Sequence, residues 1–145
     1  VHLDASWRAV LTRHPYPETV RGPLGEALAA TVLLTGTLKF DGALILQIQG
    51  EGPLRTLVAQ ATHGRTIRGL AHWEGQVPAG TIEAVFGPGR LVLTLEPERG
   101  ERYQGIVPLF GANLAEALET YFRTSEQLGT RLWLAAGPER AAGLL

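Results

Sequence analysis

The stretch 27–38, ALAATVLLTGTL, is apolar or small over twelve residues and lies between Glu26 and Lys39. It is much shorter than the roughly 20 apolar residues that a helix needs to cross a bilayer. From Leu24 onward, apolar groups fall on nearly every side of a helical projection, which is typical of a helix enclosed by other elements. The sequence therefore predicts a fold built around one buried helix, which we expect over residues 17–34.

The composition limits what can surround this helix. At 145 residues, with 45% hydrophobic and 19% charged side chains, the chain has the size and character of one ordered domain, 1–145. Thirteen basic and fourteen acidic side chains nearly cancel, so we expect no nucleic-acid partner and no membrane partner. The absence of cysteine excludes disulfides, thiolate nucleophiles and cysteine zinc sites within these residues.

Two shorter helices are also predicted. Residues 3–14 have helical spacing behind Asp4 or Ser6 as a possible N-cap, and this helix should stop before Pro15. A second short helix is expected over 81–86. No secretory signal pattern precedes the first helix, and we expect the start of the chain to be a trimmed N-terminus.

The middle of the chain carries the clearest turn signal. Asp41 and Gly42 form a dipeptide that two-residue hairpin turns favour, which predicts a hairpin over 37–49. Residues 52–62 have apolar side chains at helical spacing, which predicts a helix there. A strand is expected over 66–73.

The same order of elements returns downstream. Strands over 90–95 and 102–110 flank a turn at 96–101, an amphipathic helix follows over 112–122, and a final strand is expected over 130–136. This order suggests an internal duplication of a hairpin-helix-strand unit. The predicted fold class is α+β, with a mixed sheet of about six strands built from two such units and packed with helices.

Polar groups crowd residues 123–127, where the predicted helix gives way to a strand, and they resemble an active site. A turn explains them better, because Thr124 and Ser125 can cap backbone groups and Arg123 suits the negative end of a helix. Gly129 can take a positive φ before the strand. We interpret the segment as a turn and predict no catalytic residue in it.

A glycine-rich loop offers a second candidate site. Gly50 and Gly52 lie between a predicted strand and a predicted helix, where a dinucleotide-binding fingerprint would place glycines. Arg55 replaces the third glycine, and Pro53 explains a tight connection without any phosphate. A small-molecule or nucleotide-binding enzyme therefore remains only an alternative hypothesis.

The histidines and glutamates do not form a recognisable site. The four histidines, at positions 2, 14, 63 and 72, show no short ligand spacing, so no metal site is predicted. Glu96, Glu98 and Glu101 flank a predicted turn and are interpreted as solvated loop charges. The sequence offers no catalytic constellation, and we predict that the chain is not an enzyme.

Several predicted strands are apolar on both faces. In 43–49, ALILQIQ, one face carries Leu44, Leu46 and Ile48. The other face still carries Ile45. A sheet covered by helices on both sides would explain this pattern. Alternatively, one face is covered by something absent from this chain, which would leave an apolar surface for another segment, subunit or client.

Two long stretches resemble the heat-shock protein 33 family of redox-regulated holdase chaperones. They are LLTGTLKFDGALILQIQGEGP at 33–53 and GERYQGIVPLFGANLAEALETYFRTSEQLGTRLWL at 100–134, and a looser likeness runs from Tyr16 to Leu145. The resemblance covers the N-terminal domain of that family. It implies a cytoplasmic, ATP-independent stress-response chaperone that holds unfolding client proteins during oxidative stress and forms homodimers.

The resemblance also implies a switch that these residues do not contain. In the family, four cysteines of a C-terminal part bind zinc, and oxidation forms disulfides, expels the zinc and unfolds a linker that covers an apolar sheet face. Because this chain has no cysteine, neither the zinc site nor the switch can be assigned to any of its residues. We expect a core fragment without a cofactor, zinc being held only in the full-length family.

The resulting hypothesis is a chaperone core that binds exposed apolar segments of unfolding proteins. The candidate client-binding residues, chosen as apolar strand residues, are Ile45, Trp73, Ile106 and Trp133. Besides the enzyme alternative, in which the loop 50–55 or the polar cluster after the helix would act, a passive scaffold for the missing zinc half remains open.

Overall fold

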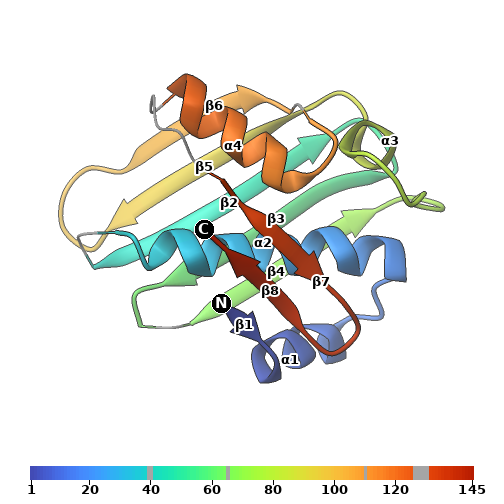
Figure 1. Cartoon of the computed structure of the whole chain (residues 1–145), viewed down its shortest axis with the longest axis horizontal. Coiled ribbons are helices and arrows are strands. Elements are labelled where there is room, and N and C mark those ends of the chain that lie inside the picture. The colour runs from blue at the N-terminus through green and yellow to red at the C-terminus, as the bar shows by residue number, and fades with distance from the viewer. Residues whose placement is uncertain (39–40, 65, 110, 126–130) are drawn as a thin grey trace.

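The computed structural model describes residues 1–38, 41–64, 66–109, 111–125 and 131–145. Within these residues the chain forms four helices and eight strands (Figure 1). In chain order they are β1 (His2–Leu3), α1 (Ala5–Arg13), α2 (Glu18–Thr35), β2 (Gly42–Gly50), β3 (Leu54–Thr62), β4 (Ile67–Trp73), α3 (Ile82–Phe86), β5 (Gly89–Pro97), β6 (Tyr103–Pro108), α4 (Leu114–Ser125), β7 (Trp133–Ala136) and β8 (Ala141–Leu144).

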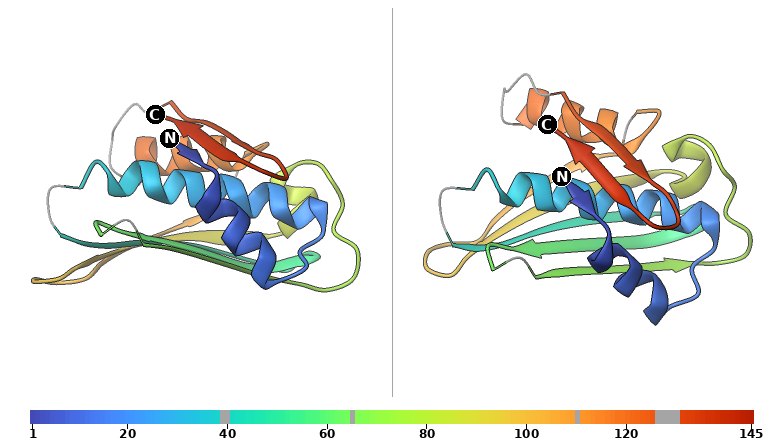
Figure 2. Two further views of the ribbon diagram at one scale, coloured as in Figure 1. Left: turned by 90° about the horizontal axis from the view of Figure 1, so that it is seen from below. Right: turned by 60° about the horizontal axis from the view of Figure 1, so that its bottom comes forward.

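The buried helix predicted from the sequence is α2, and it forms the centre of the fold. Leu24, Ala27 and Leu28 are fully buried. The helix contacts β3 and β4 on one side and β7 and β8 on the other, so it lies between two sheets. Figure 2 shows the resulting layers, with the large sheet on one side of α2 and the small sheet on the other. No helix in the described part of the chain is long and apolar enough to span a membrane.

The large sheet has five strands in the order β4-β3-β2-β5-β6, and the small sheet has three in the order β1-β8-β7. All neighbouring strands pair antiparallel. Leu44, Leu46 and Ile48 of β2 are buried on the side of the large sheet that faces α2. The α+β class is confirmed. The mixed sheet of about six strands is wrong, because the strands divide between two antiparallel sheets.

The largest error of the sequence prediction concerns residues 52–62, which form strand β3 rather than a helix. A β-bulge between Leu54 and Thr56 adds one residue to the strand, so Leu54 and Leu57 both point to the buried face at a spacing of three. That spacing imitates a helical repeat. Without a helix in the first half, the proposed duplication of a hairpin-helix-strand unit is wrong as well.

The hairpin predicted at Asp41–Gly42 is also wrong. Thr37 and Leu38 are not in a strand, while residues 39–40 lie outside the described residues. Gly42 does not have a positive φ. It begins β2, and a Cβ there would lie 2.3 Å from the Glu96 carbonyl oxygen, so glycine is needed for close strand approach. Strand β2 instead forms a hairpin with β3, the strand that follows it.

Two further helices and one strand agree closely with the sequence predictions. The short helix near 81–86 is α3, and the Thr81 hydroxyl caps it by accepting a hydrogen bond from the Ala84 amide. The amphipathic helix over 112–122 is α4, and the final strand over 130–136 overlaps β7. Two short strands, β1 and β8, were not predicted; they pair at Leu3 and Ala141 and complete the small sheet with β7.

Candidate functional site: the uncovered face of the large sheet

Helices α2, α3 and α4 and the small sheet lie on one side of the large sheet, while α1 runs beside its edge strand β4 (Figure 2). No element of the described residues lies across the other side of the sheet. We call this side the open face. Strand alternation and register place its residues. They are Arg68, Leu70 and His72 of β4, Thr56, Val58, Gln60 and Thr62 of β3, Ala43, Ile45, Gln47 and Gln49 of β2, Arg90, Val92, Thr94 and Glu96 of β5, and Gln104, Ile106 and Pro108 of β6.

A continuous row of paired residues crosses the open face at mid-height. Its members, from one edge strand to the other, are Leu70, Val58, Gln47, Val92 and Ile106. All are apolar except Gln47. The two ends of the row are the most accessible, since Leu70 is 52% exposed and Ile106 is 56% exposed. The open face therefore presents a band with apolar residues on four of its five strands, interrupted by Gln47 on the central strand β2.

Polar side chains border this apolar row, and cross-strand hydrogen bonds hold several of them. Arg90 Nε and Nη2 donate to Gln49 Oε1 at 3.0 and 2.7 Å. On the other side of the row, Gln104 Nε2 donates to Thr94 Oγ1 at 3.1 Å. These bonds connect neighbouring strands on both sides of the band, although the bordering row of Thr94 and Gln104 also includes the apolar Ile45.

The arrangement suits non-covalent binding of an apolar segment. A band of apolar side chains gains free energy by removing partner surface from water, at about 25 cal/mol per Å². The edge strands β4 and β6 also present backbone groups to which an extended segment could add. Such binding depends on apolar area and extended shape and therefore favours broad specificity.

The structure divides the four residues predicted to bind clients. Ile45 and Ile106 lie on the open face, although in different rows. Trp73 lies on the opposite face and packs half-buried against Tyr16, with ring centroids 5.6 Å apart. Trp133 belongs to the small sheet and is 57% exposed. The structure brings two of the four onto one surface.

Three apolar residues of the open face were missed. Leu70 lies between Arg68 and His72 on the exposed side of β4. An apolar residue that alternates with polar ones in a predicted strand could have been recognised from the sequence as a candidate exposed residue. Val58 was hidden by the incorrect helix prediction for its segment. Val92 pairs directly with Ile106, but it is 6% exposed, so it belongs to the floor of the band rather than its accessible surface.

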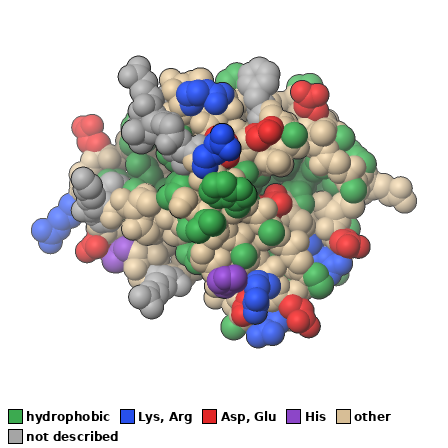
Figure 3. All heavy atoms as spheres, in the orientation of Figure 1, with side chains coloured by type: hydrophobic (Ala, Val, Ile, Leu, Met, Phe, Trp, Pro, Cys, Tyr) green, Lys and Arg blue, Asp and Glu red, His purple; other side chains and the backbone are tan. Residues whose placement is uncertain are grey.

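A second apolar surface lies on the far side of the molecule. Trp133 of β7 pairs with Leu144 of β8, and Leu144 is 61% exposed. Figure 3 shows hydrophobic side chains gathered in the middle of this side, over β7 and β8. This surface is separated from the open face by α2 and the large sheet, so the two can be tested independently.

The polar cluster after α4 behaves as a helix end in the residues that are described. The Thr124 hydroxyl donates to the Thr120 carbonyl oxygen at 2.8 Å, one turn back within α4. That carbonyl is not among the last four of the helix, so a capping role for Thr124 stays a prediction. Arg123 lies in the last turn, and α4 ends at Ser125, whose side chain is not described. Gly129 and the rest of 126–130 lie outside the described residues.

The glycine-rich loop is part of the β2–β3 hairpin and does not lead into a helix. Gly52 donates its amide to the Phe86 carbonyl oxygen at 2.7 Å. A Cβ at Gly50 would lie 2.2 Å from the same oxygen, so both glycines permit close packing against the end of α3. The strand-loop-helix context that a dinucleotide fingerprint requires is absent here, because Leu54–Thr62 is a strand.

Comparisons with known proteins agree with this fold. The sequence matches the family profile described as Hsp33 protein over residues 1–145. It is 63% identical to the 33 kDa chaperonin of Nitrosococcus oceani over 144 residues, 99% of this chain and 50% of that protein. It is 45% identical to the 33 kDa chaperonin of Vibrio parahaemolyticus over 100% of this chain and 52% of that protein.

A crystal structure of the 33 kDa chaperonin from Thermotoga maritima superimposes with a TM-score of 0.82 at 26% identity, covering 94% of this chain and 51% of that one. The chain thus spans about half the length of the relatives it matches. These relatives are named as chaperonins, not as enzymes. With its whole length matched by the family profile and its fold shared with a solved member, the chain belongs to the Hsp33 protein family.

Proposed function

We propose that this chain is the client-binding core of an ATP-independent holdase chaperone. The observation that carries the proposal is the open face, where a band with apolar residues on four of the five strands ends in the exposed Leu70 and Ile106. Unfolding proteins expose apolar segments in extended conformations, and such a band buries them without bond-making chemistry. The family and the names of its members support a chaperone role.

Regulation belongs to the longer protein in this proposal. The chain spans half the length of its relatives, so residues beyond this half could supply a cover for the open face. A cysteine-zinc switch in that part would release the cover on oxidation and expose the band. The chain would then act constitutively when separated from the other half, in the cytoplasm and as a homodimer.

Light scattering from a heat-unfolding client protein tests the proposal. The chain is added at equal molar amount, without ATP and without oxidant. Suppressed scattering is expected, because the open face needs neither. Unchanged scattering, with the chain shown by circular dichroism to be folded, would overturn the proposal and leave the domain as a scaffold for the other half.

A further inference from the structure

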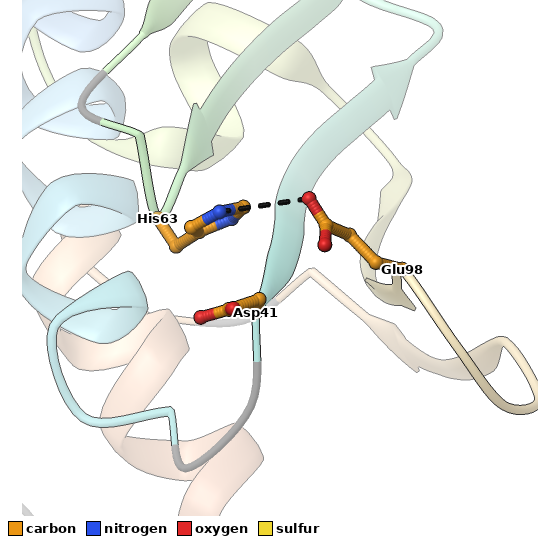
Figure 4. A group of neighbouring side chains, drawn as sticks. All are labelled: Asp41, His63 and Glu98. Atoms are coloured by element: carbon orange, nitrogen blue, oxygen red, sulfur yellow. Dashed lines mark ion pairs between the residues drawn. The ribbon is translucent and has the colours of Figure 1, made fainter.

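Three strand ends of the large sheet bring together one imidazole and two carboxylates. Asp41 lies directly before β2, His63 follows β3 and Glu98 follows β5. One potential ligand atom from each residue lies within 4.8 Å of the others. Figure 4 shows the His63 ring facing the Glu98 carboxylate, with Asp41 beside them. From this convergence we propose that Asp41, His63 and Glu98 form a binding site for a divalent transition-metal ion of the zinc class.

The backbone fixes the three residues relative to one another. The His63 amide donates to the Gly42 carbonyl oxygen at 3.0 Å, and the Glu98 amide donates to the Asp41 carbonyl oxygen at 2.9 Å. These bonds extend the pairing of β2 with β3 and β5 one step past the strand ends. The side chains therefore start from anchored positions, and only exposed side-chain torsions need to adjust when an ion binds.

The spacing of the ligand atoms fits one ion. His63 Nε2 and Glu98 Oε1 are 3.5 Å apart. Two ligands of a tetrahedral zinc ion, each at roughly 2.0–2.2 Å from the metal, are about 3.3–3.6 Å apart. This pair is thus already at coordination spacing. Asp41, with a carboxylate oxygen within 4.8 Å of the other two ligand atoms, would supply the third ligand after a rotation of its exposed side chain. Solvent can occupy the fourth position because all three residues are exposed.

The surroundings of the imidazole also suit a metal ligand. His63 Nδ1 lies 3.0 Å from the Gly42 nitrogen and 3.3 Å from the Gly42 oxygen, so the backbone can hold either neutral tautomer. In the tautomer that carries its proton on Nδ1, this nitrogen donates to the Gly42 oxygen. Nε2 then presents its lone pair toward Glu98, which is the usual arrangement of a metal-bound histidine.

The ligand chemistry selects the class of ion. One imidazole nitrogen with two carboxylate oxygens suits zinc and similar ions, whereas magnesium prefers oxygen ligands and keeps its water shell. Two carboxylates beside one imidazole also leave net negative charge that a divalent cation neutralises. A bound ion would link the ends of β2, β3 and β5 and stabilise the large sheet.

Isothermal titration of the 145-residue chain with zinc chloride tests the site. We expect saturable binding of one ion per chain, weakened by about tenfold or more in both His63→Gln and Glu98→Gln. His72→Gln is the matched control, because His72 also lies near a carboxylate, with Nε2 3.9 Å from Glu74 Oε1, but outside this cluster. Zinc binding by this control should equal that of the original chain.

Thermal unfolding supplies a second readout. Zinc should raise the melting temperature of the original chain and of His72→Gln, but not that of Glu98→Gln, and magnesium at the same concentration should have no effect. Glu98→Gln alters one exposed side chain, so the test holds even if His63→Gln fails to fold. Absence of zinc binding by the original chain, or equal binding by Glu98→Gln, would overturn the proposal. So would an equal loss in His72→Gln.

Discussion

Leu70 and Ile106 lie on the two edge strands of the large sheet, at opposite ends of one row of directly paired residues. Both side chains are more than half exposed. Three residues of the row, Val58, Gln47 and Val92, lie between them. An extended client segment that crosses the strands would meet both in one pass. The pair therefore defines the accessible ends of the proposed binding band.

Replacing both residues should remove apolar surface without harming the fold. We expect Leu70→Ser combined with Ile106→Ser to change the free energy of unfolding by no more than about 0.5 kcal/mol, because exposed side chains contribute little packing. Urea unfolding measures this. A dye that fluoresces on apolar surface should bind the double variant less than the original chain. A large loss of stability would show that the two side chains are structural.

Glu26 gives the chain a pH-dependent stability. This half-buried side chain of α2 lines a cavity of about 180 Å³ with Ile48, Phe86 and Leu114, and burial raises its pKa to about 7 from an ordinary value of 4.5. Between pH 4.5 and pH 7, the Glu26 carboxyl is therefore protonated in the folded state and ionised in the unfolded state. This group's contribution is greatest below pH 4.5 and declines as pH rises toward 7.

The variant Glu26→Gln should be more stable than the original chain above pH 7, where the ionised carboxylate is costly. We expect a gain of about 1–2 kcal/mol at pH 8, discounted for partial solvent access, and little or no gain at pH 4.5. Urea unfolding at both pH values measures the difference. An equal effect at the two values would contradict the assigned cause.

Two glycines of α2 should respond differently to alanine. A Cβ at Gly25 would lie 2.5 Å from the Ala136 Cβ and 3.0 Å from the Trp7 ring, where the small sheet packs on the helix. We expect Gly25→Ala to destabilise the chain by about 1–3 kcal/mol. A Cβ at Gly22 would meet nothing within 4 Å beyond its chain neighbours, but Pro23 follows and disfavours helical backbone for a residue that carries a Cβ. This cost offsets the gain in helix propensity, so Gly22→Ala should change the free energy of unfolding by no more than about 0.5 kcal/mol. Chemical denaturation of both variants decides whether this packing is as tight as described.

Trp7 ties α1 to the turn between β7 and β8. It is fully buried, and its indole Nε1 donates to the Gly137 carbonyl oxygen at 2.7 Å. Trp7→Phe should cost about 1–3 kcal/mol, because it leaves that oxygen without its donor and opens a small cavity. Trp133→Phe, at an exposed position, is the control and should fall within about 0.5 kcal/mol of the original chain. Equal melting temperatures for the two variants would refute the structural role of Trp7.

The sequence predicted those elements whose patterns have a single interpretation. The long apolar run in α2 and the amphipathic spacing in α4 each indicated a helix, because both patterns are too long for a typical strand. Residues 52–62 were different, because the bulge near Leu54 placed two inward leucines three apart and imitated a helix. Bulges depend on strand pairing, which local spacing does not encode.

The candidate surface was predictable in kind but not in detail. Apolar residues on both faces of β2 allowed two explanations, helices on both sides of the sheet or an uncovered side, and the described residues have the second arrangement. Assigning Trp73 to it failed because the face of a strand residue depends on where helices pack, and α2 and Tyr16 lie on the side of Trp73. The small sheet was missed since β1 and β8 are too short to show an alternating pattern.

The most direct test compares client aggregation in the presence of three chains. Light scattering from a heat-unfolding protein is recorded with the original chain, with the Leu70→Ser and Ile106→Ser double variant, and with Trp133→Ser as a control that removes an equally exposed side chain from the other sheet. We predict that the double variant loses most of the suppression, while Trp133→Ser retains it. Full suppression by a folded double variant, or an equal loss in Trp133→Ser, would contradict the assignment of client binding to the open face.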